Sequence, residues 1–382
     1  MKRLLDVSGV AKAPRSGGAD PASATDFADP GFSADLIRWQ KKHGRHALPW
    51  QNTRDAYRIW LSEIMLQQTQ VAAVIPYYHR FLLSFPDVAS LAAAPAEEVM
   101  AHWSGLGYYT RARNLHQCAK RVVAEFDGRF PDDPDLLVAL PGIGRSTAAA
   151  IAAFAYGTRA AILDGNVKRV FARVFGIDGF PGEKAIENRL WQRAVALLPA
   201  CDLESYTQGL MDLGATICTR SKPLCASCPM AKRCVALRTD RVSELPMRKL
   251  KKAIPERQTA MLLVIDNQQV LLEQRPSHGI WGGLLSLPEI TASGNSSEFE
   301  GQVARAVTPF GVVAGYDKLA PFSHTFTHFK LHIAPYRVNL SRRQELAGQF
   351  EHQWLHADKI GDAPLPAPVK KLLLAVFSEL AA

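Results

Sequence analysis

The sequence of 382 residues predicts a mostly α-helical domain followed by a smaller α+β domain. Residues 33–240 carry apolar side chains at helical spacing, whereas residues from about 258 onward alternate as strands do. Between them, residues 241–257 (RVSELPMRKLKKAIPER) are basic, contain two prolines and lack periodicity, which indicates a linker. We therefore expect domains over 32–240 and 258–380.

The helical region is expected to consist of short helices separated by turns. The segment ADLIRWQKKHG ends as a helix at Gly44, and a long helix over 57–82 is expected to break at Pro76. In NVKRVFARVF, at 166–175, apolar residues every three or four positions share one face. Further helices are expected over 87–93, 95–103, 110–125, 133–139, 145–156, 183–197 and 204–213.

Strand signals dominate the C-terminal region. The segment TAMLLVIDNQQVLLEQRP, at 259–276, predicts two strands around an Asp-Asn turn. The segment FTHFKLHIAPYRV, at 326–338, alternates in the same way. These segments place a sheet in the second domain.

Charge and composition narrow the class of partner. A net charge of +9 and a pI near 9.3 favour a polyanion such as nucleic acid. We find no apolar run long enough for a membrane span and no secretory signal, so a cytoplasmic protein is expected. Residues 1–31 are expected to form a disordered extension, because 11–31 are small, polar and rich in Pro and Gly. A mitochondrial presequence is the alternative, and the aspartates at 20, 26 and 29 weaken it.

Four of the six cysteines crowd into residues 218–234. Their spacing is Cys218-x6-Cys225-x2-Cys228-x5-Cys234, which indicates a metal site rather than disulfides in a chain without an export signal. Thiolates suit either zinc or an iron–sulfur cluster, and the spacing alone leaves the two open. Basic residues between the cysteines are typical of phosphate binding, or of a solvated face.

The segment ALPGIGRSTAAAIAAFAYG, at 139–157, places two glycines in a turn before an Ala-rich helix. A dinucleotide fingerprint is excluded because a helix precedes the turn and Thr147 stands where the third glycine belongs. The phosphate-loop pattern also fails. A helix–hairpin–helix over about 133–156 remains, with Gly142 and Gly144 letting the backbone approach a DNA phosphate. A plain helical turn is the other interpretation.

These motifs occur together in one order: WLSEIMLQQTQV, GLGYYTRARNL, LPGIGRSTA, LDGNVKRV and the cysteine cluster. The set resembles the endonuclease III superfamily of DNA glycosylases and, within it, the adenine DNA glycosylase (MutY) family. The resemblance implies a helix–hairpin–helix glycosylase fold and a 4Fe–4S cluster on the four cysteines. It also implies a monomer that acts on double-stranded DNA containing adenine opposite 8-oxoguanine or guanine, in the bacterial cytoplasm and nucleoid.

The resemblance assigns the catalytic residues. Removing a purine requires a flipped nucleotide, a proton on the leaving base and a negative charge beside the sugar cation. Glu63 matches the general acid, and a carboxyl among apolar neighbours keeps its proton more readily. Asp164 matches the oxocarbenium stabiliser, supported by Asn166, and a carboxylate near a helix N-terminus is expected to stay ionised. From residue context alone, Glu63 would be a surface glutamate and Asp164 a helix cap.

Three further residues follow from the same resemblance. Gln68 and Tyr108 match residues that enter the base stack around the mispair, and an aromatic ring can replace lost stacking. Ser146 occupies the position at which the endonuclease III pattern has a lysine. A hydroxyl cannot form an imine with the sugar, so we expect base removal without strand cleavage.

The segment LLEQRPSHGIWGGLLSLPE, at 271–289, resembles the start of a Nudix domain. The glutamate cluster of the Nudix signature is missing from the residues that follow, so a magnesium site and pyrophosphatase activity are not expected. In the MutY family this domain recognises 8-oxoguanine through a Phe-Ser-His loop, which is Phe322-Ser323-His324 in this chain.

Two other functions are alternatives to this one. The first is a bifunctional, endonuclease III-like enzyme for damaged pyrimidines, which the C-terminal domain disfavours. The second is a non-catalytic iron–sulfur protein that binds DNA, which the pair Glu63 and Asp164 disfavours.

Overall fold

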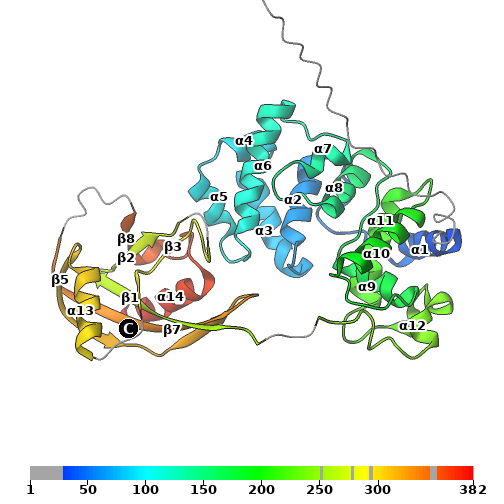
Figure 1. The fold of residues 1–382 in the computed structure, drawn as a ribbon. Coiled ribbons are helices and arrows are strands. Elements are labelled where there is room, and N and C mark those ends of the chain that lie inside the picture. The colour runs from blue at the N-terminus through cyan, green and yellow to red at the C-terminus, as the bar shows by residue number, and fades with distance from the viewer. Residues whose placement is uncertain (1–28, 250–252, 277–278, 292–295, 345–350, 382) are drawn as a thin grey trace, which may run out of the picture. The chain divides into compact units, whose positions relative to one another are not determined.

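The structure is a computed structural model that describes residues 29–249, 253–276, 279–291, 296–344 and 351–381 (Figure 1). The chain forms two compact units, and neither is continuous in sequence. The first unit contains the residues up to Arg45 together with Arg159–Arg248, and the second contains His46–Thr158 together with Lys249–Ala382. Residues 1–28 of the expected extension and 250–252 of the expected linker lie outside the described residues. Pro30 and Gly31, the end of that extension, already belong to a helix.

The first unit is helical. Its elements are α1 (Pro30–His43), α9 (Gly165–Val174), α10 (Lys184–Ala196), α11 (Leu203–Asp212), η4 (Leu213–Ile217), η5 (Cys225–Ser227), η6 (Ala231–Arg233) and α12 (Val235–Arg238). Asp29 caps α1 by accepting a hydrogen bond from the backbone N–H of Phe32. The ring of Phe32 then packs edge-on against Phe171 of α9, with centroids 5.9 Å apart. These contacts join the N-terminal helix to the α9–α12 segment.

The helices of the second unit are α2 (Ala56–Leu66), α3 (Val71–Ser84), α4 (Val88–Ala93), α5 (Ala96–Trp103), α6 (Thr110–Phe126), α7 (Pro134–Val138), α8 (Arg145–Ile151) and η3 (Ala152–Tyr156). The expected break at Pro76 is wrong, because Pro76 lies inside α3. The chain instead breaks after Leu66, where Gln68 takes a left-handed backbone conformation with φ 59°.

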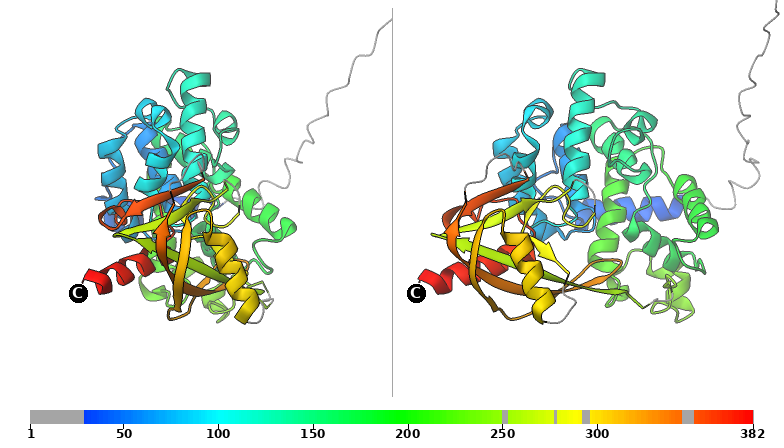
Figure 2. Two further views of the ribbon diagram at one scale, coloured as in Figure 1. Left: turned by 90° about the vertical axis from the view of Figure 1, so that its left-hand side faces the viewer. Right: turned by 60° about the vertical axis from the view of Figure 1, so that its left-hand side comes forward.

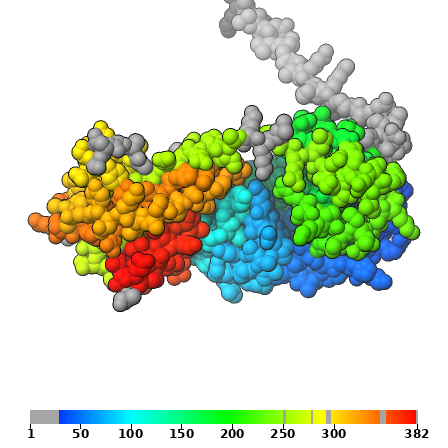
Figure 3. All heavy atoms as spheres, turned by 90° about the horizontal axis from the view of Figure 1, so that it is seen from below, coloured from blue at the N-terminus to red at the C-terminus, as the bar shows by residue number. Residues whose placement is uncertain are grey.

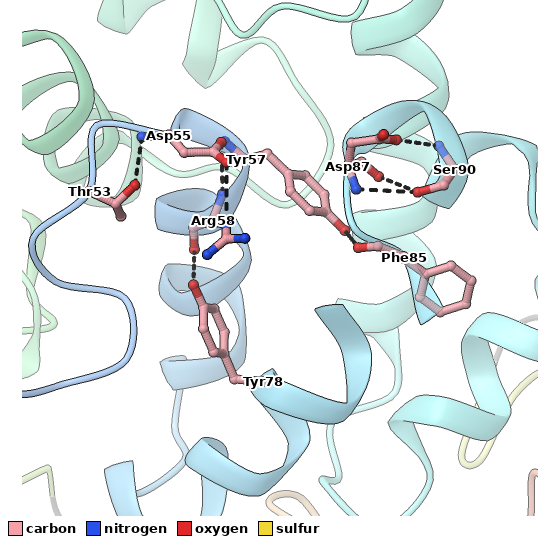
Figure 4. A network of polar contacts seen from close by, with 8 residues as sticks. All are labelled: Thr53, Asp55, Tyr57, Arg58, Tyr78, Phe85, Asp87 and Ser90. Atoms are coloured by element: carbon pink, nitrogen blue, oxygen red, sulfur yellow. Dashed lines mark hydrogen bonds and ion pairs between the residues drawn. The ribbon is translucent and has the colours of Figure 1, made fainter. Parts of the chain in front are cut away.

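Polar contacts fix the N-terminal half of α2 (Figure 4). Asp55 caps the helix by accepting from the backbone N–H of Tyr57 at 2.9 Å. The hydroxyl of Tyr57 donates to the carbonyl of Phe85 at 2.6 Å, and the hydroxyl of Tyr78 on α3 approaches the carbonyl of Arg58 at 3.4 Å. Burial raises the pKa of Tyr78 to about 12, so this hydroxyl keeps its proton.

The C-terminal part of the second unit is a mixed sheet. Its strands are β1 (Glu256–Asp266), β2 (Gln269–Gln274), β3 (Leu285–Ser286), β4 (Glu289–Ile290), β5 (Gly311–Lys318), β6 (Phe322–Thr325), β7 (Lys330–Arg343) and β8 (His352–His356). The central order is β3-β2-β1-β7-β5, and β1 runs parallel to β7 while the other pairs are antiparallel. The short helix η7 (Ala357–Lys359) follows β8. The first expected strand segment, 259–276, contributes most of β1 and all of β2, whereas in the second, 326–338, residues 326–329 connect β6 to β7 and the strand begins at Lys330.

Two helices cover opposite faces of the sheet: α13 (Ser296–Val307) and α14 (Ala367–Ala381). Alternate side chains of β1 determine this arrangement. Leu262 packs in one cluster with Val303 of α13, whereas Leu263 packs in the other with Leu373 of α14. In Figure 2 the yellow α13 and the red α14 accordingly lie on different sides of the sheet.

The larger of these clusters continues into the helical part of the second unit. Ser104 donates from its hydroxyl to the carbonyl of Leu365, just before α14, at 3.1 Å. Figure 3 shows the red C-terminal residues directly beside the cyan helical residues. The sheet and the α2–α8 helices therefore share one hydrophobic core. None of the helices in the described ranges is long and apolar enough to cross a membrane.

Candidate active site

Glu63 lies on α2, among buried neighbours. Ser62, Ile64 and Met65 are buried, and Glu63 itself is half-buried. The helix is held at its N-terminal end by the Asp55 cap and by Tyr57 and Tyr78 (Figure 4). The carboxyl therefore extends from a rigid helix rather than from a loop, which favours a fixed position for a proton donor.

Gln68 and Tyr108 occupy two separate turns that share an unusual backbone conformation. Gln68 follows α2 with φ 59°, and Tyr108 precedes α6 with φ 52°. Both side chains are exposed, Tyr108 at 50%. A left-handed conformation is uncommon for residues with a side chain and persists only where the surroundings enforce it. The neighbouring Tyr109 is buried and accepts from the backbone N–H of Gly105.

The glycine turn joins α7 to α8, as expected for a hairpin. Gly142 has φ 78°, and an added Cβ would lie 2.9 Å from Cβ of Asn114, so only glycine fits well. Gly144 caps α8 and is exposed, with no atom within 4 Å of an added Cβ. The backbone around Gly144 is therefore open to a ligand. Ser146 is the second residue of α8 and is half-buried.

Asp164 caps α9 in the first unit. Its Oδ1 accepts from the backbone N–H of Val167 at 2.8 Å, and its Oδ2 accepts from the side-chain amide of Asn166 at 3.2 Å. Burial raises the pKa of Asp164, and these hydrogen bonds and the charge of Arg169 oppose the shift. The sequence predicts an ionised carboxylate at a helix cap. That prediction did not include burial, which has the larger effect on the pKa.

Arg169 is a residue that the sequence analysis missed. It donates to Oδ1 of Asn166 at 2.8 Å and also to the carbonyls of Gly214 and Cys218, both at 2.7 Å. An added Cβ on Gly214 would lie 2.5 Å from Cβ of Asn166, so η4 approaches α9 closely here. Arg169 lies one turn after Asn166 on α9, but its partners on η4 are far away in sequence, so helical spacing alone gave no signal.

The four cysteines line one cavity in the first unit. Most of its other walls are apolar, with Val170, Leu213 and Ile217 among them. Burial raises the pKa of Cys228 to about 11, and the three other thiols also raise it. Arg173 lies beside this cavity, 3.4 Å from Sγ of Cys218. In the parts of the chain that the structure describes, no three His, Cys, Asp or Glu side chains are arranged to hold a metal ion.

A groove of about 730 Å³ runs along the second unit between its helical part and its sheet. Tyr108 and Arg113 line it from the helical part, and Trp281, His324 and Phe326 line it from strand β6 and from turns of the C-terminal part. The Trp281 ring lies 5.7 Å from the His324 ring and 5.4 Å from the Phe326 ring. Two residues predicted to act at a mispair, Tyr108 and His324, therefore face one surface.

The predicted Phe-Ser-His loop is the strand β6, and its residues divide between two faces. Phe322 packs against the core, His324 lines the groove, and Ser323 is exposed. Burial lowers the pKa of His324, which favours its neutral form. Trp281 and Phe326, which hold His324, were not expected from the sequence.

Two family models match this chain, one in each part. Residues 61–195 match the model of the HhH-GPD superfamily of base excision DNA repair proteins, and residues 260–375 match the NUDIX domain model. The adenine DNA glycosylase of Buchnera aphidicola subsp. Schizaphis graminum is 36% identical over 90% of this chain and 97% of its own length. The human adenine DNA glycosylase is 31% identical over 89% of this chain and 73% of its own length.

Solved structures also resemble this chain in fold. The structure of a thermostable thymine-DNA glycosylase matches 57% of this chain and 99% of its own, with a TM-score of 0.51 and 30% identity. The expected fold, a helix–hairpin–helix glycosylase domain followed by a Nudix-like domain, is confirmed. By the identity and the coverage of these relatives, the chain belongs to the adenine DNA glycosylase family.

Proposed function

We propose that the protein is a monofunctional adenine DNA glycosylase that removes adenine mispaired with 8-oxoguanine, or with guanine, from double-stranded DNA. The observation that carries this proposal is the groove lined by both Tyr108 and His324. Selecting a mispair requires a side chain that can enter the stack and groups that contact the opposite base. A groove that offers both on one surface supports this specificity.

Glu63 is assigned the role of general acid. It would protonate the adenine as the glycosidic bond breaks and would then help to activate water. Its position on a helix whose neighbouring residues are buried supports this role, because water competes less for the proton there. Glu63 and Asp164 belong to different units.

Asp164 is assigned the stabilisation of the oxocarbenium ion. Its carboxylate accepts hydrogen bonds from Val167 and Asn166, which oppose the rise in pKa caused by burial and so support the ionised form that the role requires. In a half-buried site this negative charge acts on a nearby cation more strongly than it would in water. Asn166 supports the carboxylate and is itself held by Arg169.

We assign a 4Fe–4S cluster to Cys218, Cys225, Cys228 and Cys234. Four sulfurs around one cavity suit a cluster with one thiolate per iron, whereas a zinc ion needs four sulfurs about 2.3 Å from a single point. When bound, the cluster would tie four points of the 218–234 segment together. Arg173 donates to the carbonyl of Thr219 at 2.7 Å and would offset thiolate charge. Stoichiometric zinc without acid-labile sulfide in anaerobically purified protein would contradict this assignment.

The DNA backbone is the proposed partner of the hairpin around Gly144, where the chain is open to a ligand. The net charge of +9 supports a polyanionic partner. We further propose that the protein acts as a monomer on the nucleoid, in the bacterial cytoplasm.

One incubation tests the function against its rivals. Duplexes with adenine opposite 8-oxoguanine, adenine opposite thymine, thymine opposite guanine, and thymine glycol are treated in parallel, and abasic sites are revealed with alkali. We expect cleavage after alkali only for adenine opposite 8-oxoguanine and, more weakly, opposite guanine. Release of thymine or thymine glycol would favour a pyrimidine glycosylase, and binding without release of any base would favour a non-catalytic protein.

A further inference from the structure

Arg111 is a buried arginine at the start of α6, with 7% of its surface exposed. Burial lowers its pKa to about 10, so the guanidinium remains charged at neutral pH. Its hydrogen-bond acceptors are uncharged oxygens of the surrounding backbone and of one threonine. A buried charge is costly unless it is paired or hydrogen-bonded, so these contacts are what makes the burial of Arg111 tolerable.

One side of the guanidinium contacts the end of the catalytic helix and the turn after it. Nη1 donates to the carbonyls of Ile64 at 2.9 Å and Met65 at 2.7 Å, in the last turn of α2. Nη2 donates to the hydroxyl of Thr69 at 3.0 Å, directly after Gln68. A cation at a helix C-terminus is favourable, so Arg111 also caps the helix that carries Glu63.

The other side contacts the turn before α6. Nη2 donates to the carbonyl of Gly107 at 3.1 Å, directly before Tyr108. The guanidinium also lies 5.5 Å from the ring of Tyr108 and 5.2 Å from the ring of Trp103. One side chain therefore fastens both left-handed turns, those of Gln68 and Tyr108, to the end of α2.

We propose that Arg111 is a positioning residue that couples Gln68 and Tyr108, so that the two side chains enter the base stack as one rigid unit fixed to the helix of Glu63. This inference rests on the proposed function. The guanidinium is suited to the task because its planar fork contacts two turns at once. A lysine ammonium has no such fork and cannot hold both turns in the same geometry.

A double-mutant cycle tests the coupling. Arg111→Lys, Gln68→Ala and Tyr108→Ala are made singly, and Arg111→Lys is combined with each of the others. The rate of adenine release opposite 8-oxoguanine is measured under single-turnover conditions. We expect Arg111→Lys to lower the rate about tenfold or more, the scale of a lost charged hydrogen bond. Each double variant should fall within about twofold of its slower single variant, because both changes disable one unit.

Controls separate positioning from general stability. Arg121→Lys, on the same helix, alters an arginine that donates to the carbonyl of Ala139, and it should leave the rate unchanged. Unfolding midpoints identify a temperature at which every variant is folded. Arg111→Gln serves as a second variant, which keeps an amide donor but loses the fork and should again be non-additive with Tyr108→Ala.

The outcomes are distinct for the two proposals. Additive losses in folded variants, or a wild-type rate for Arg111→Lys, would overturn the coupling role while leaving the proposed function intact. Absence of adenine release by the wild-type protein from the same duplex would overturn the proposed function, and the Arg111 inference with it.

Discussion

The side-chain amide of Asn166 donates a hydrogen bond to Oδ2 of Asp164 over 3.2 Å, and Arg169 in turn holds Asn166 at 2.8 Å. Arg169 also reaches the carbonyl of Cys218, the first cysteine of the proposed cluster. The carboxylate and the cysteine segment are thus connected through two polar side chains. Because of this connection, a change in the position of the cysteine segment should also change the geometry of Asp164.

The partly buried carboxylate of Asp164 should reduce the stability of the folded protein. Burial raises its folded-state pKa above the ordinary 3.8, so the folded protein binds this proton more tightly than the unfolded chain. This difference lowers the free energy of unfolding. The loss is absent below the unfolded-state pKa and grows as the pH rises through the folded-state pKa. Asp164→Asn, which keeps a capping side chain, should raise the unfolding midpoint at pH 7 and lower adenine release about a hundredfold or more.

Thermal unfolding of both proteins between pH 3.5 and pH 8 checks this prediction. The gain in stability of Asp164→Asn should shrink as the pH falls toward the ordinary value of 3.8. A variant that is less stable than wild type at pH 7 would show that the capping hydrogen bonds outweigh burial.

The close approach of η4 to α9 predicts an effect of Gly214→Ala. The added Cβ would lie 2.5 Å from Cβ of Asn166 and must displace it from Asp164. We expect a loss of about 1–3 kcal/mol in stability, as for other overpacked sites, together with slower adenine release. Gly301→Ala on α13 is the matched control, because its Cβ would meet only Arg305, at 3.9 Å, and it should stabilise slightly.

The position of Glu63 predicts that Glu63→Gln abolishes adenine release. Glutamine keeps the shape of the side chain but has no proton to give, so the rate should fall by about 10²–10⁴-fold. Binding to a duplex with adenine opposite 8-oxoguanine should persist, which fluorescence anisotropy measures. Glu97→Gln, an exposed glutamate on α5, should change neither property. Turnover near the wild-type value in Glu63→Gln would remove the general acid from this position.

The Trp281 ring holds His324 in the groove, so Trp281→Leu should weaken mispair discrimination. We expect the ratio of rates opposite 8-oxoguanine and guanine to fall toward that of His324→Ala, with the double variant no lower, since the two rings act together. Phe299→Leu is the control, because its ring packs at 4.5 Å on Tyr336, in the cluster on the other face of the sheet. An unchanged ratio in His324→Ala would contradict the role assigned to the groove.

The role of the C-terminal part in mispair discrimination is better tested with point variants than with truncation after residue 240. The sheet shares its core with α2–α8, and Arg113 on α6 donates to the carbonyl of Gly282. Removing the residues after 240 would expose apolar side chains of the α2–α8 helices, which include the helix of Glu63. A truncated chain should therefore lose stability as well as discrimination, which would confuse the two effects.

Local patterns predicted most helices within a few residues, because periodicity reports directly on burial. The sequence predicts a break at Pro76, but the chain breaks after α2, where no proline is present. A buried arginine distant in sequence, Arg111, holds the turn at Gln68 instead. The same limitation applies to Arg169 and Trp281: each acts through partners that only the folded chain brings close, and a single sequence carries no trace of these contacts.

Ser146 predicts the absence of strand cleavage. Cleavage by β-elimination needs an amine that forms an imine with the sugar, and Ser146, in the first turn of α8, offers only a hydroxyl. Lys168, four residues after Asp164, carries an amine that could replace the missing one. Its Nζ is paired with Glu187 at 2.7 Å in the first unit, so it should trap the sugar only slowly. Wild-type product strands should therefore stay intact until alkali is added, whereas Ser146→Lys should gain measurable nicking and a borohydride-trapped complex.

Ser146→Arg is the matched control, since it adds the positive charge without a primary amine and should gain neither. Nicking by the wild type as fast as base release, or trapping by Ser146→Arg equal to that by Ser146→Lys, would place the nucleophile elsewhere in the chain.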